Sequence, residues 1–437
     1  MNWTQLLSPA RLGQPASLSA STRSAFEQDY DRIIFSHPFR RLQDKTQVHP
    51  LPEYDFVHTR LTHSLEVSSV GRSLGKKVGE VLLQRHPELS EKYSLFDFGA
   101  IVAAAALAHD LGNPPFGHAG EDALSDFFKG QSAIKPEVTV SEWEDLIRFE
   151  GNAQGFRILN QQEYGLKLTM ATLGAFTKYP CEAHFPDREK IRRSQKKYGF
   201  FQSEKDLFKE IATQLQLIET KTQAWCRHPL AFLVEAADDI CYSVIDLEDG
   251  CRLGLVSFDE TVDLLAPVLG SKLDRQKLSG PDGLNKKLGI LRALAIGELI
   301  EACAEVFLKN EDLILRGEYD KALVDETSFQ DALKRIGTVS VERIYRAREV
   351  TEIEAAGHVV LPGLLDEFIA AGRVIRDRGK SRKFENLGLL FPLETRMAIA
   401  ESKSMYVMLR LIIDFVSGLT DRHALSLYRK IKGISLS

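Results

Sequence analysis

The sequence predicts an all-α protein, because apolar residues recur at helical spacing along most of its length. Alternation of apolar and polar residues, which marks a half-buried strand, is scarce. Of the 437 residues, 44% are hydrophobic and 27% are charged, so the chain can bury a large core and is neither disordered nor a coiled coil. We therefore expect a helical bundle with additional C-terminal helices.

The earliest long helix is predicted over Thr59–Gln84, where apolar residues recur every two to four positions. His86 and Pro87 follow and end it. A second helix, Phe98–Leu111, is apolar nearly all round, which is typical of a helix at the centre of a bundle. It stops at residues 112–115, Gly-Asn-Pro-Pro, because proline cannot continue a helix.

Later parts of the chain also show helical periodicity, and the sequence contains no internal repeat. A small hairpin is expected at most at Gly174–Lys178 or near Val359–Val360, where the pattern is ambiguous. The further predicted helices are Ala119–Phe128, Ser141–Asn160, Leu207–Thr222, Pro229–Glu248, Gly289–Lys309, Phe329–Arg348, Leu361–Ala371 and Leu393–Val416.

The net charge of −5, from 56 basic and 61 acidic residues, excludes a globally basic nucleic-acid coat. Two basic segments, Arg192–Lys197 and Arg373–Lys383, fit solvated loops and anion-binding sites equally well. The five cysteines form no C-x-x-C pair, which favours a reduced, cytoplasmic setting. No secretory signal is visible, and the most apolar window, Gly99–Ala108, is too short to span a membrane.

Two histidines and two aspartates form a candidate metal site. His63 lies in the first predicted helix, His109 and Asp110 end the central apolar helix, and Asp238 lies in a later helix. Imidazole nitrogens and carboxylate oxygens suit Mn²⁺, Mg²⁺, Fe²⁺ or Zn²⁺, and the lack of a thiolate favours the harder ions. Each residue alone is more often an ordinary core or helix-end residue. A His-Asp pair at the end of an apolar helix is nevertheless costly to bury unless a cation compensates it.

A candidate catalytic pair follows directly in the chain. A turn rich in glycine and proline returns His118 toward His109 and Asp110. Glu121 follows His118 by three residues, so the two side chains share one face of a new helix. A carboxylate beside an imidazole orients it and raises its basicity, as general acid–base chemistry requires. The alternative is that Glu121 only caps the helix.

Asp238, Tyr242 and Asp246 follow one another at spacings of four, which places them on one stripe of a helix. The stripe carries ligand-type and aromatic residues where a core helix would carry aliphatic ones. A carboxylate and a phenol one turn apart could hold a sugar hydroxyl and a ring. Ordinary packing of Tyr242 is the alternative.

The pattern of His63, His109–Asp110 and Asp238 resembles the H…HD…D signature of the HD-domain metallophosphohydrolases. A narrower resemblance, to the bacterial deoxyguanosine triphosphate triphosphohydrolases, runs from about Asp29 to Asp246 and continues weakly at Arg343–Tyr345. It is carried by Phe39–Val48, Arg60–Ser64, His109–Glu121 and Phe149–Gln154.

The resemblance implies an enzyme that hydrolyses a deoxynucleoside triphosphate, dGTP first among them, to the deoxynucleoside and tripolyphosphate. It implies an HD-domain bundle, which we place as a catalytic core over 25–310, with an N-terminal arm over 1–24 and a helical C-terminal region over 311–437 packing on the core. The family's metal ligands correspond to His63, His109, Asp110 and Asp238. Its catalytic pair corresponds to His118 and Glu121, with His118 as base or acid. Its substrate contacts correspond to Gln47, Arg60, Asn152, Lys178, Lys197, Tyr242 and Asp246.

Many two-metal HD enzymes carry a histidine where this chain has Asn113, which is a weak metal ligand. We therefore expect one divalent metal per site, Mn²⁺ or Mg²⁺ before Fe²⁺, Co²⁺, Ni²⁺ or Zn²⁺. The resemblance also implies a homo-oligomer, often a hexamer. A dNTP effector and single-stranded DNA are further expected partners, with no membrane association.

Two other interpretations stay open. An HD-domain phosphodiesterase or guanosine-tetraphosphate-type hydrolase would leave Gln47, Tyr242 and Asp246 without a shared role. A non-catalytic nucleotide or single-stranded nucleic-acid binding protein is supported only by the two basic segments.

Overall fold

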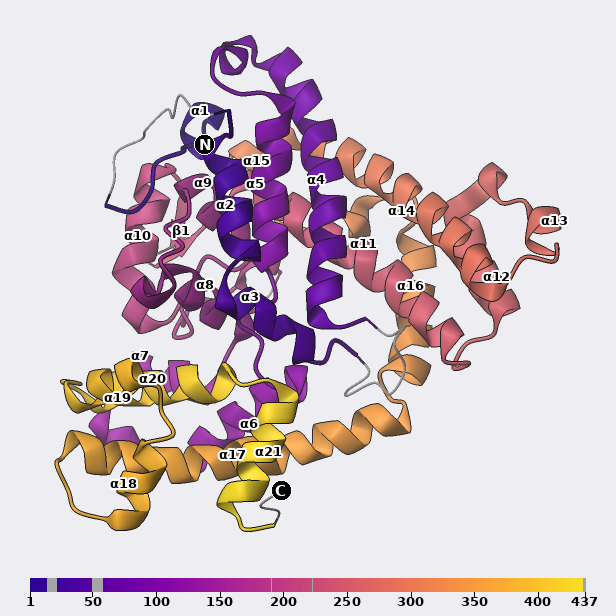
Figure 1. The fold of residues 1–437 in the computed structure, drawn as a ribbon. Helices are drawn as coiled ribbons and strands as arrows, with labels where there is room; N and C mark the ends of the chain where they lie inside the picture. The colour runs from indigo at the N-terminus through magenta and orange to yellow at the C-terminus, as the bar shows by residue number, and fades with distance from the viewer. Residues whose placement is uncertain (14–21, 49–57, 190, 222, 435–437) are drawn as a thin grey trace.

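Helices dominate the computed structural model, and the predicted all-α class is confirmed. Figure 1 shows two layers: a large upper bundle, and a lower layer formed mainly by the C-terminal helices. The structure describes residues 1–13, 22–48, 58–189, 191–221 and 223–434.

The bounds of the elements are as follows. The N-terminal half contains α1 (Trp3–Leu6), α2 (Ala25–Ile34), α3 (His37–Arg41), α4 (Arg60–Arg85), α5 (Leu95–Ala108), α6 (Gly117–Lys129), α7 (Val140–Ile147), α8 (Gly151–Asn160), α9 (Met170–Phe176) and α10 (Lys205–Gln214). Two short antiparallel strands follow, β1 (Glu219–Lys221) and β2 (Ala224–Trp225). The remaining helices are α11 (Pro229–Arg252), α12 (Phe258–Leu269), α13 (Arg275–Leu278), α14 (Leu284–Lys309), α15 (Glu311–Leu315), α16 (Gln330–Val339), α17 (Arg348–Arg376), α18 (Arg382–Gly388), α19 (Leu393–Ala400), α20 (Met405–Ser417) and α21 (Asp421–Ile431).

The upper bundle is centred on the packing of α5 against α4, where glycines let the two backbones approach closely. A Cβ on Gly71 would lie 3.1 Å from a side chain of α5. A Cβ on Gly75 would lie 2.7 Å from the carbonyl oxygen of Phe98, and one on Gly79 would lie 2.8 Å from the Phe98 side chain. Because the three glycines are four residues apart, they form one stripe along α4. This stripe fixes the end of α5, where His109 follows, relative to α4.

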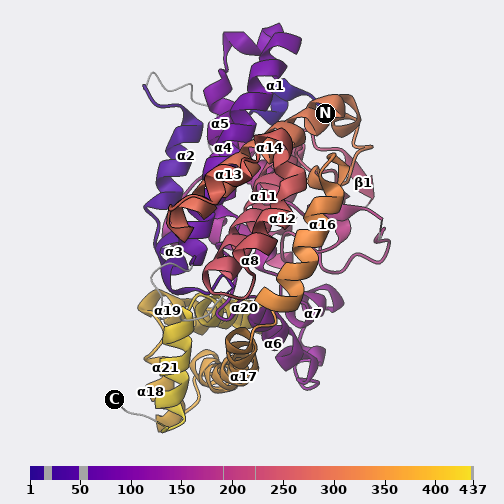
Figure 2. The same cartoon turned by 90° about the vertical axis from the view of Figure 1, so that its right-hand side faces the viewer.

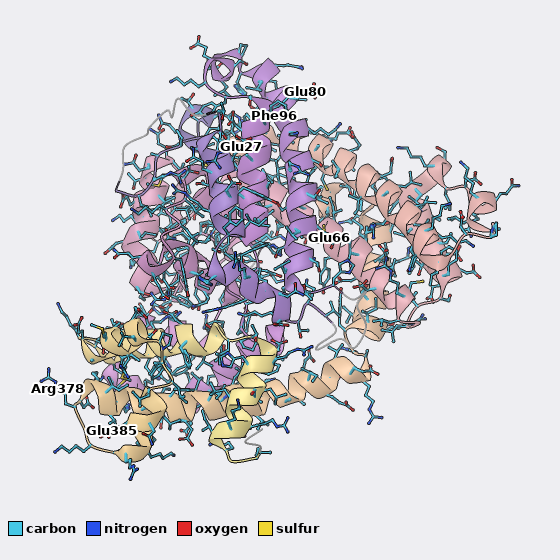
Figure 3. The ribbon with its side chains drawn as sticks, viewed as in Figure 1. Glu27, Glu66, Glu80, Phe96, Arg378 and Glu385 are labelled. Atoms are coloured by element: carbon cyan, nitrogen blue, oxygen red, sulfur yellow. The ribbon has the colours of Figure 1, made fainter. Side chains whose placement is uncertain are left out.

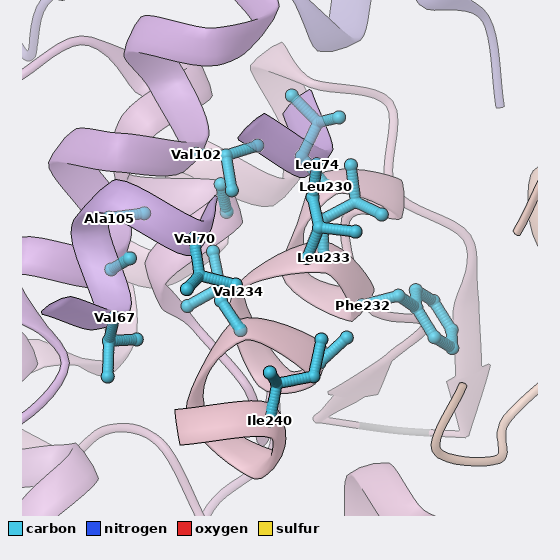
Figure 4. Close-up of a cluster of buried hydrophobic side chains, with 14 of the residues drawn as sticks. Val67, Val70, Leu74, Val102, Ala105, Leu230, Phe232, Leu233, Val234 and Ile240 are labelled. Atoms are coloured by element: carbon cyan, nitrogen blue, oxygen red, sulfur yellow. The ribbon is translucent and has the colours of Figure 1, made fainter. Parts of the chain in front are cut away.

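An aliphatic cluster attaches α11 to that pair. Val70 and Leu74 of α4 lie in one buried core with Val102 of α5 and Val234 of α11 (Figure 4). Burying one such side chain contributes about 1.5–3 kcal/mol to folding. The cluster therefore anchors the stretch of α11 that carries Asp238, one turn after Val234.

The lower layer is built around α17, and α6 from the N-terminal half packs against it (Figures 1 and 2). Phe116, just before α6, lies in one buried cluster with Leu361 and Phe368 of α17. A Cβ on Gly357 of α17 would lie only 3.0 Å from Phe116. The lower layer therefore packs directly on the segment that leads to His118.

The predicted domain limits at residues 24 and 310 stay predictions, and residues 14–21 of the arm lie outside the described part. Leu323, Ile336 and Ile344 belong to the core of the upper bundle, so the chain after residue 310 contributes to both layers. Among the described helices, none is long and apolar enough to cross a membrane.

Two predicted helices end early. The single helix predicted at Ser141–Asn160 is wrong, because Glu150 is extended and caps a new helix, α8, by accepting from the N–H of Asn152. The helix predicted at Leu207–Thr222 is wrong beyond Gln214. Gln216 has φ of 53°, in the left-handed region that ends helices, and β1 follows.

The later corrections concern the C-terminal part. The predicted helix Phe329–Arg348 is wrong beyond Val339, where a π-helical turn (Ser340–Ile344) follows. Leu361–Ala371 lies inside the much longer α17. The predicted helix Leu393–Val416 is two helices, because Ser404 caps α20 and so separates it from α19.

A small hairpin exists, but at neither of the two positions where the sequence pattern was ambiguous. Gly174–Lys178 covers the end of α9 and the residues just after it, and Val359–Val360 lies inside α17. The hairpin is formed by β1 and β2, whose five residues are too few to show an alternating pattern.

The basic segment Arg373–Lys383 lies at the outer edge of the lower layer, where Figure 3 labels Arg378. Arg373 forms an ion pair with Glu137 and Lys383 with Glu367, each at 2.7 Å. These pairs favour its interpretation as a solvated surface segment.

Candidate active site

The four predicted ligand side chains converge from α4, the two residues that follow α5, and α11. The Nε2 of His63 lies 3.3 Å from Oδ1 of Asp238, and the Nε2 of His109 lies 3.6 Å from the same oxygen. Oδ1 of Asp110 lies 3.4 Å from Nε2 of His109. His63, His109 and Asp110 are close enough together to bind a single metal ion.

The donor chemistry of this cluster fits a divalent cation. Nδ1 of His109 lies 2.7 Å from the carbonyl oxygen of Ala106, so its N–H donates there and Nε2 keeps a lone pair. That lone pair faces carboxylate oxygens of Asp110 and Asp238. Burial would raise the pKa of both carboxyls, but the positive charges of neighbouring groups, His109 first among them, hold each pKa below its ordinary value. Electron pairs that point at one another in this way are stabilised by a cation between them.

Asp110 is oriented by two donors. Nη1 of Arg60 donates to Oδ2 at 2.7 Å, and Nδ2 of Asn113 donates to Oδ1 at 2.5 Å. Burial would raise the pKa of Asp110, but His109 and Arg60 lower it to about 2, so the group is a carboxylate at neutral pH. Arg60 is the first residue of α4, whose N-terminus Thr59 caps.

The predicted catalytic pair is formed. Nδ1 of His118 lies 2.8 Å from Oε2 of Glu121, and the other carboxylate oxygen accepts the N–H of Gly151 at 2.6 Å. The His118 side chain is 78% exposed, whereas that of Glu121 is 9% exposed. The hydrogen bond with the Glu121 carboxylate, together with its negative charge, raises the pKa of His118. The imidazole is thus held by one nitrogen while the other is open.

A left-handed backbone turn just before α6 sets the position of His118. Phe116 has φ of 65°, and Gly117 follows with φ of 59°. Two successive left-handed residues turn the chain sharply, and such a conformation costs an aromatic residue about 1–3 kcal/mol unless its surroundings hold it. The turn delivers His118 to the first turn of α6.

The metal-type cluster and His118 of the predicted catalytic pair line one cavity of about 520 Å³. Two buried polar atoms on its wall, Oε1 of Gln47 and Nε of Arg60, have no hydrogen-bond partner within the described part of the chain. Buried polar atoms are rarely left unpaired, so both are available to a ligand. The predicted substrate residues that line the cavity are Gln47, Arg60, Asn152, Lys178, Lys197 and Tyr242.

Asp246 is placed differently from Tyr242. Its carboxylate, 3% exposed, is not on the cavity wall and accepts a hydrogen bond from the hydroxyl of Tyr345 at 2.8 Å. The ring of Tyr345 lies 5.3 Å from that of Tyr242, between centroids. Asp246 therefore does not line the cavity itself but binds Tyr345, which does line it and which was not assigned to the site from the sequence.

One side of the cavity is basic. Arg193, Lys196 and Lys197 line it, so the segment Arg192–Lys197 belongs to the cavity rather than to a solvated loop. Nε of Arg193 donates to the buried carboxylate of Glu235 at 2.6 Å, and Lys178 lies 3.5 Å from the same group. This carboxylate, which also lines the cavity, holds the two cations beside each other.

Arg193, Tyr345 and Glu354 are among the lining residues that were not assigned to the site from the sequence. Arg193 was visible as part of a basic segment, and Tyr345 as part of the weak similarity around Arg343. The exposed residue Glu354 lies near the start of α17 and carried no motif that could have identified it.

Comparisons with known proteins agree with this geometry. Residues 60–150 match the family described as HD domain, and residues 323–430 match the phosphohydrolase-associated domain. The first match contains the His63, His109, Asp110 cluster and the pair His118–Glu121. An all-α bundle with this site defines the chain as an HD-domain phosphohydrolase, a class of divalent-metal enzymes.

Full-length relatives narrow the class. The chain is 44% identical to a deoxyguanosinetriphosphate triphosphohydrolase-like protein of Synechocystis sp., over all of both chains. It is 41% identical to a protein of the same name from Pseudomonas aeruginosa, over 100% of this chain and 99% of the relative. It is 32% identical to the deoxyguanosinetriphosphate triphosphohydrolase of Yersinia pestis, over 93% of each. The chain belongs to the deoxyguanosinetriphosphate triphosphohydrolase-like family, which confirms the predicted family and, with it, an enzyme.

Proposed function

We propose that the protein hydrolyses deoxynucleoside triphosphates, dGTP first among them, to the deoxynucleoside and tripolyphosphate. The observation that carries the proposal is that His118, held by Glu121, lines the same cavity as the cluster of His63, His109, Asp110 and Asp238. The names of the full-length relatives support the same substrate.

His63, His109, Asp110 and Asp238 would hold one divalent cation, Mn²⁺ or Mg²⁺ before Fe²⁺, Co²⁺, Ni²⁺ or Zn²⁺. When bound, such a cation polarises a phosphoryl oxygen and neutralises its charge. Asn113 supports a single ion, because its amide is already engaged in orienting Asp110.

The basic wall would bind the triphosphate. Arg60, Lys178 and Lys197, with Arg193 beside them, present cations to a ligand that carries about four negative charges. Asn152 lines the same cavity, where its amide donates to Glu150.

His118 would protonate the departing 5′-oxygen while a water attacks the α-phosphorus. The raised pKa of its imidazole favours the acid over the base role, because more of the protonated form is present at neutral pH. Glu121 holds Nδ1 and so directs the N–H at Nε2 toward the cavity.

The sugar would lie against Gln47, Tyr242 and Tyr345, with Asp246 orienting the Tyr345 hydroxyl. Closely packed rings beside C2′ leave no partner for a ribose 2′-hydroxyl, so ribonucleotides are disfavoured. Glu354, whose carboxylate can accept both N–H groups on the Watson–Crick edge of guanine, supports dGTP as the preferred substrate.

The same proposal extends to organisation and partners. We keep a catalytic core at 25–310 with a C-terminal region at 311–437, a cytoplasmic homo-oligomer, and a dNTP effector and single-stranded DNA as further ligands. Exposed Leu389, Leu393 and Met397 on the lower layer are compatible with a subunit contact.

The test is incubation of Mn²⁺-loaded protein with each dNTP and with GTP, alone and in pairs, followed by product analysis. We expect tripolyphosphate from dGTP fastest, at least about tenfold slower cleavage of GTP, and loss of the dGTP preference in Glu354→Ala. Pyrophosphate or a linear monophosphate would instead indicate another HD chemistry. Salt-sensitive binding of single-stranded DNA without any hydrolysis would indicate a binding protein.

A further inference from the structure

One carboxylate of the C-terminal region reaches two loops of the cavity at once. Asp421, the first residue of α21, is 1% exposed. Its Oδ1 accepts the N–H of Phe116 at 3.0 Å. Its Oδ2 accepts the N–H of Thr46 at 3.0 Å and also the Thr46 hydroxyl. Thr46 precedes Gln47 in the cavity wall, and Phe116 lies two residues before His118.

The Phe116 end of this bridge is where the backbone most needs support. Phe116 holds its left-handed conformation although it has a bulky side chain. Its ring packs against Gly357 of α17, and its N–H would have no helical partner because it precedes α6. The hydrogen bond to Asp421 and the contact with α17 both come from the C-terminal region.

A second bridge runs in parallel. Lys45, 4% exposed, donates from Nζ to the carbonyl oxygen of Asn113 at 2.6 Å and to that of Ser417 at 2.9 Å. It therefore connects the two cavity loops to the last residue of α20. Ser417 ends α20 and Asp421, four positions later, begins α21, so one short C-terminal segment receives both bridges.

We infer that Asp421 is a positioning residue for the reaction: it holds Phe116 and Thr46 so that His118 and Gln47, which follow them in the chain, keep their places in the cavity wall. In this way Asp421, which belongs to the phosphohydrolase-associated region, supports the active site without itself touching the substrate. The inference rests on the proposed function, because the rate of dGTP hydrolysis is the measure of whether His118 is correctly positioned. Misplacement of a reacting group by about 1 Å can cost about 100-fold in rate.

The test compares Asp421→Ala with two controls from the same segment. Thr420→Ala removes the cap of α21, a bond to the N–H of His423, without touching either loop. Ser417→Ala removes a buried hydroxyl that has no hydrogen-bond partner in the described part of the chain and keeps the carbonyl that Lys45 uses. Asp421→Asn, which keeps an acceptor for Phe116 but turns an NH₂ group toward the Thr46 donors, serves as a milder variant if the alanine variant does not fold.

For Asp421→Ala we expect kcat/KM for dGTP to fall about 10- to 100-fold, with Mn²⁺ affinity by calorimetry within threefold of wild type. The kcat/KM of Asp421→Asn should lie between those of wild type and Asp421→Ala. Both control variants should keep kcat/KM within about twofold of wild type. Hydrogen exchange should quicken at the amides of residues 116–119 in the Asp421 variants alone.

Two results would overturn the inference: wild-type kcat/KM in Asp421→Ala, or an equal loss in Thr420→Ala, which would reduce Asp421 to general support of α21. If the wild-type protein cleaves no dNTP, the proposed function fails, and hydrogen exchange at residues 116–119 still decides whether Asp421 holds the turn.

Discussion

At the scale of single residues, the imidazole of His118 is held by one partner and otherwise faces an open cavity. Its Nδ1 contacts Glu121, which is in turn fixed by the N–H of Gly151. Neither residue contacts the proposed metal ligands through a hydrogen bond or ion pair in the described part of the chain. Metal binding and proton transfer should therefore be separable by mutation.

Replacing His118 by alanine should lower kcat for dGTP at least about 100-fold, because a positioned general acid contributes 10²–10⁴-fold. Mn²⁺ affinity, measured by calorimetry, should remain within about threefold of wild type. His109→Ala is the matched control, since it should lose both activity and metal. Near-wild-type turnover in His118→Ala would remove the residue from the mechanism.

The Glu121→Gln variant tests the direction of proton transfer. The carboxylate of Glu121 raises the pKa of His118 above its ordinary value. If His118 donates its proton, kcat/KM falls as pH rises through that pKa, so loss of the negative charge should move this alkaline limb to lower pH. The pH–rate profile measures the shift.

Asp126→Asn, on the same helix but paired with Lys129, should leave the limb in place. An acidic limb that moves instead would identify His118 as the base.

The site residues that could be predicted from the sequence are those whose residue types and spacing are characteristic of metal binding or acid–base chemistry. His109, Asp110, His118 and Glu121 lie within one short segment of thirteen residues, so their spacing could be read from the sequence. Tyr345 is different, because its hydroxyl meets Asp246 across a separation of 99 residues. Such a pairing depends on tertiary packing, so no short spacing between the two residues in the sequence could have predicted it.

At the scale of elements, the turn after α5 crosses α8 at very short range. A Cβ on Gly112 would lie 2.0 Å from the carbonyl oxygen of Gly151 and 2.1 Å from the nitrogen of Gly155. These neighbours are backbone atoms, which cannot rotate away as a side chain can. The turn is therefore locked by contact as well as by its prolines.

Gly112→Ala should lower the free energy of unfolding by more than about 3 kcal/mol, beyond the usual cost of overpacking. Gly297→Ala is the matched control: this residue is exposed in α14, and a Cβ added there would meet no atom within 4 Å. It should raise the free energy of unfolding by about 0.5–1 kcal/mol. Urea unfolding measures both, and equal effects would contradict the predicted crossing.

Long helices were predictable because their apolar faces run over many turns, as in α4, α5 and α11. Breaks inside a helical pattern were not. The pattern continues through Arg148–Glu150, yet the chain leaves the helix there because Glu150 caps α8 and the carbonyl of Arg148 accepts the hydroxyl of Tyr198. Both contacts depend on the folded environment rather than on apolar periodicity.

At the scale of the whole molecule, a buried polar network joins the two layers. Arg157 of α8 donates from Nε to both carboxylate oxygens of Asp414 in α20, at 2.9 Å each, and from Nη2 at 2.7 Å. Gln154 and Gln161 donate to the same carboxylate. Asp414 is therefore the polar anchor of α20.

Asp414→Ala should lower the free energy of unfolding by about 3–5 kcal/mol, because it leaves the Arg157 guanidinium buried without its main partner. Urea unfolding, followed through the tryptophans, checks the value: Trp3 and Trp225 report on the core of the upper bundle and Trp143 on that of the lower layer. Asp366→Ala, at an exposed position of α17, should change stability by less than about 0.5 kcal/mol. Similar effects of the two substitutions would show that the network does not anchor α20.

The glycine stripe of α4 also constrains how this protein can diverge. A Cβ on Gly75 would lie 2.9 Å from the Cα of Gly99, so neither helix can gain a carbon atom there unless the other yields. Tolerated changes at positions 71, 75 and 79 should therefore occur together with changes at positions 98, 99 and 102. Among diverged descendants, paired covariation between these two sets would be the evolutionary trace of a contact that keeps two imidazoles at a fixed separation.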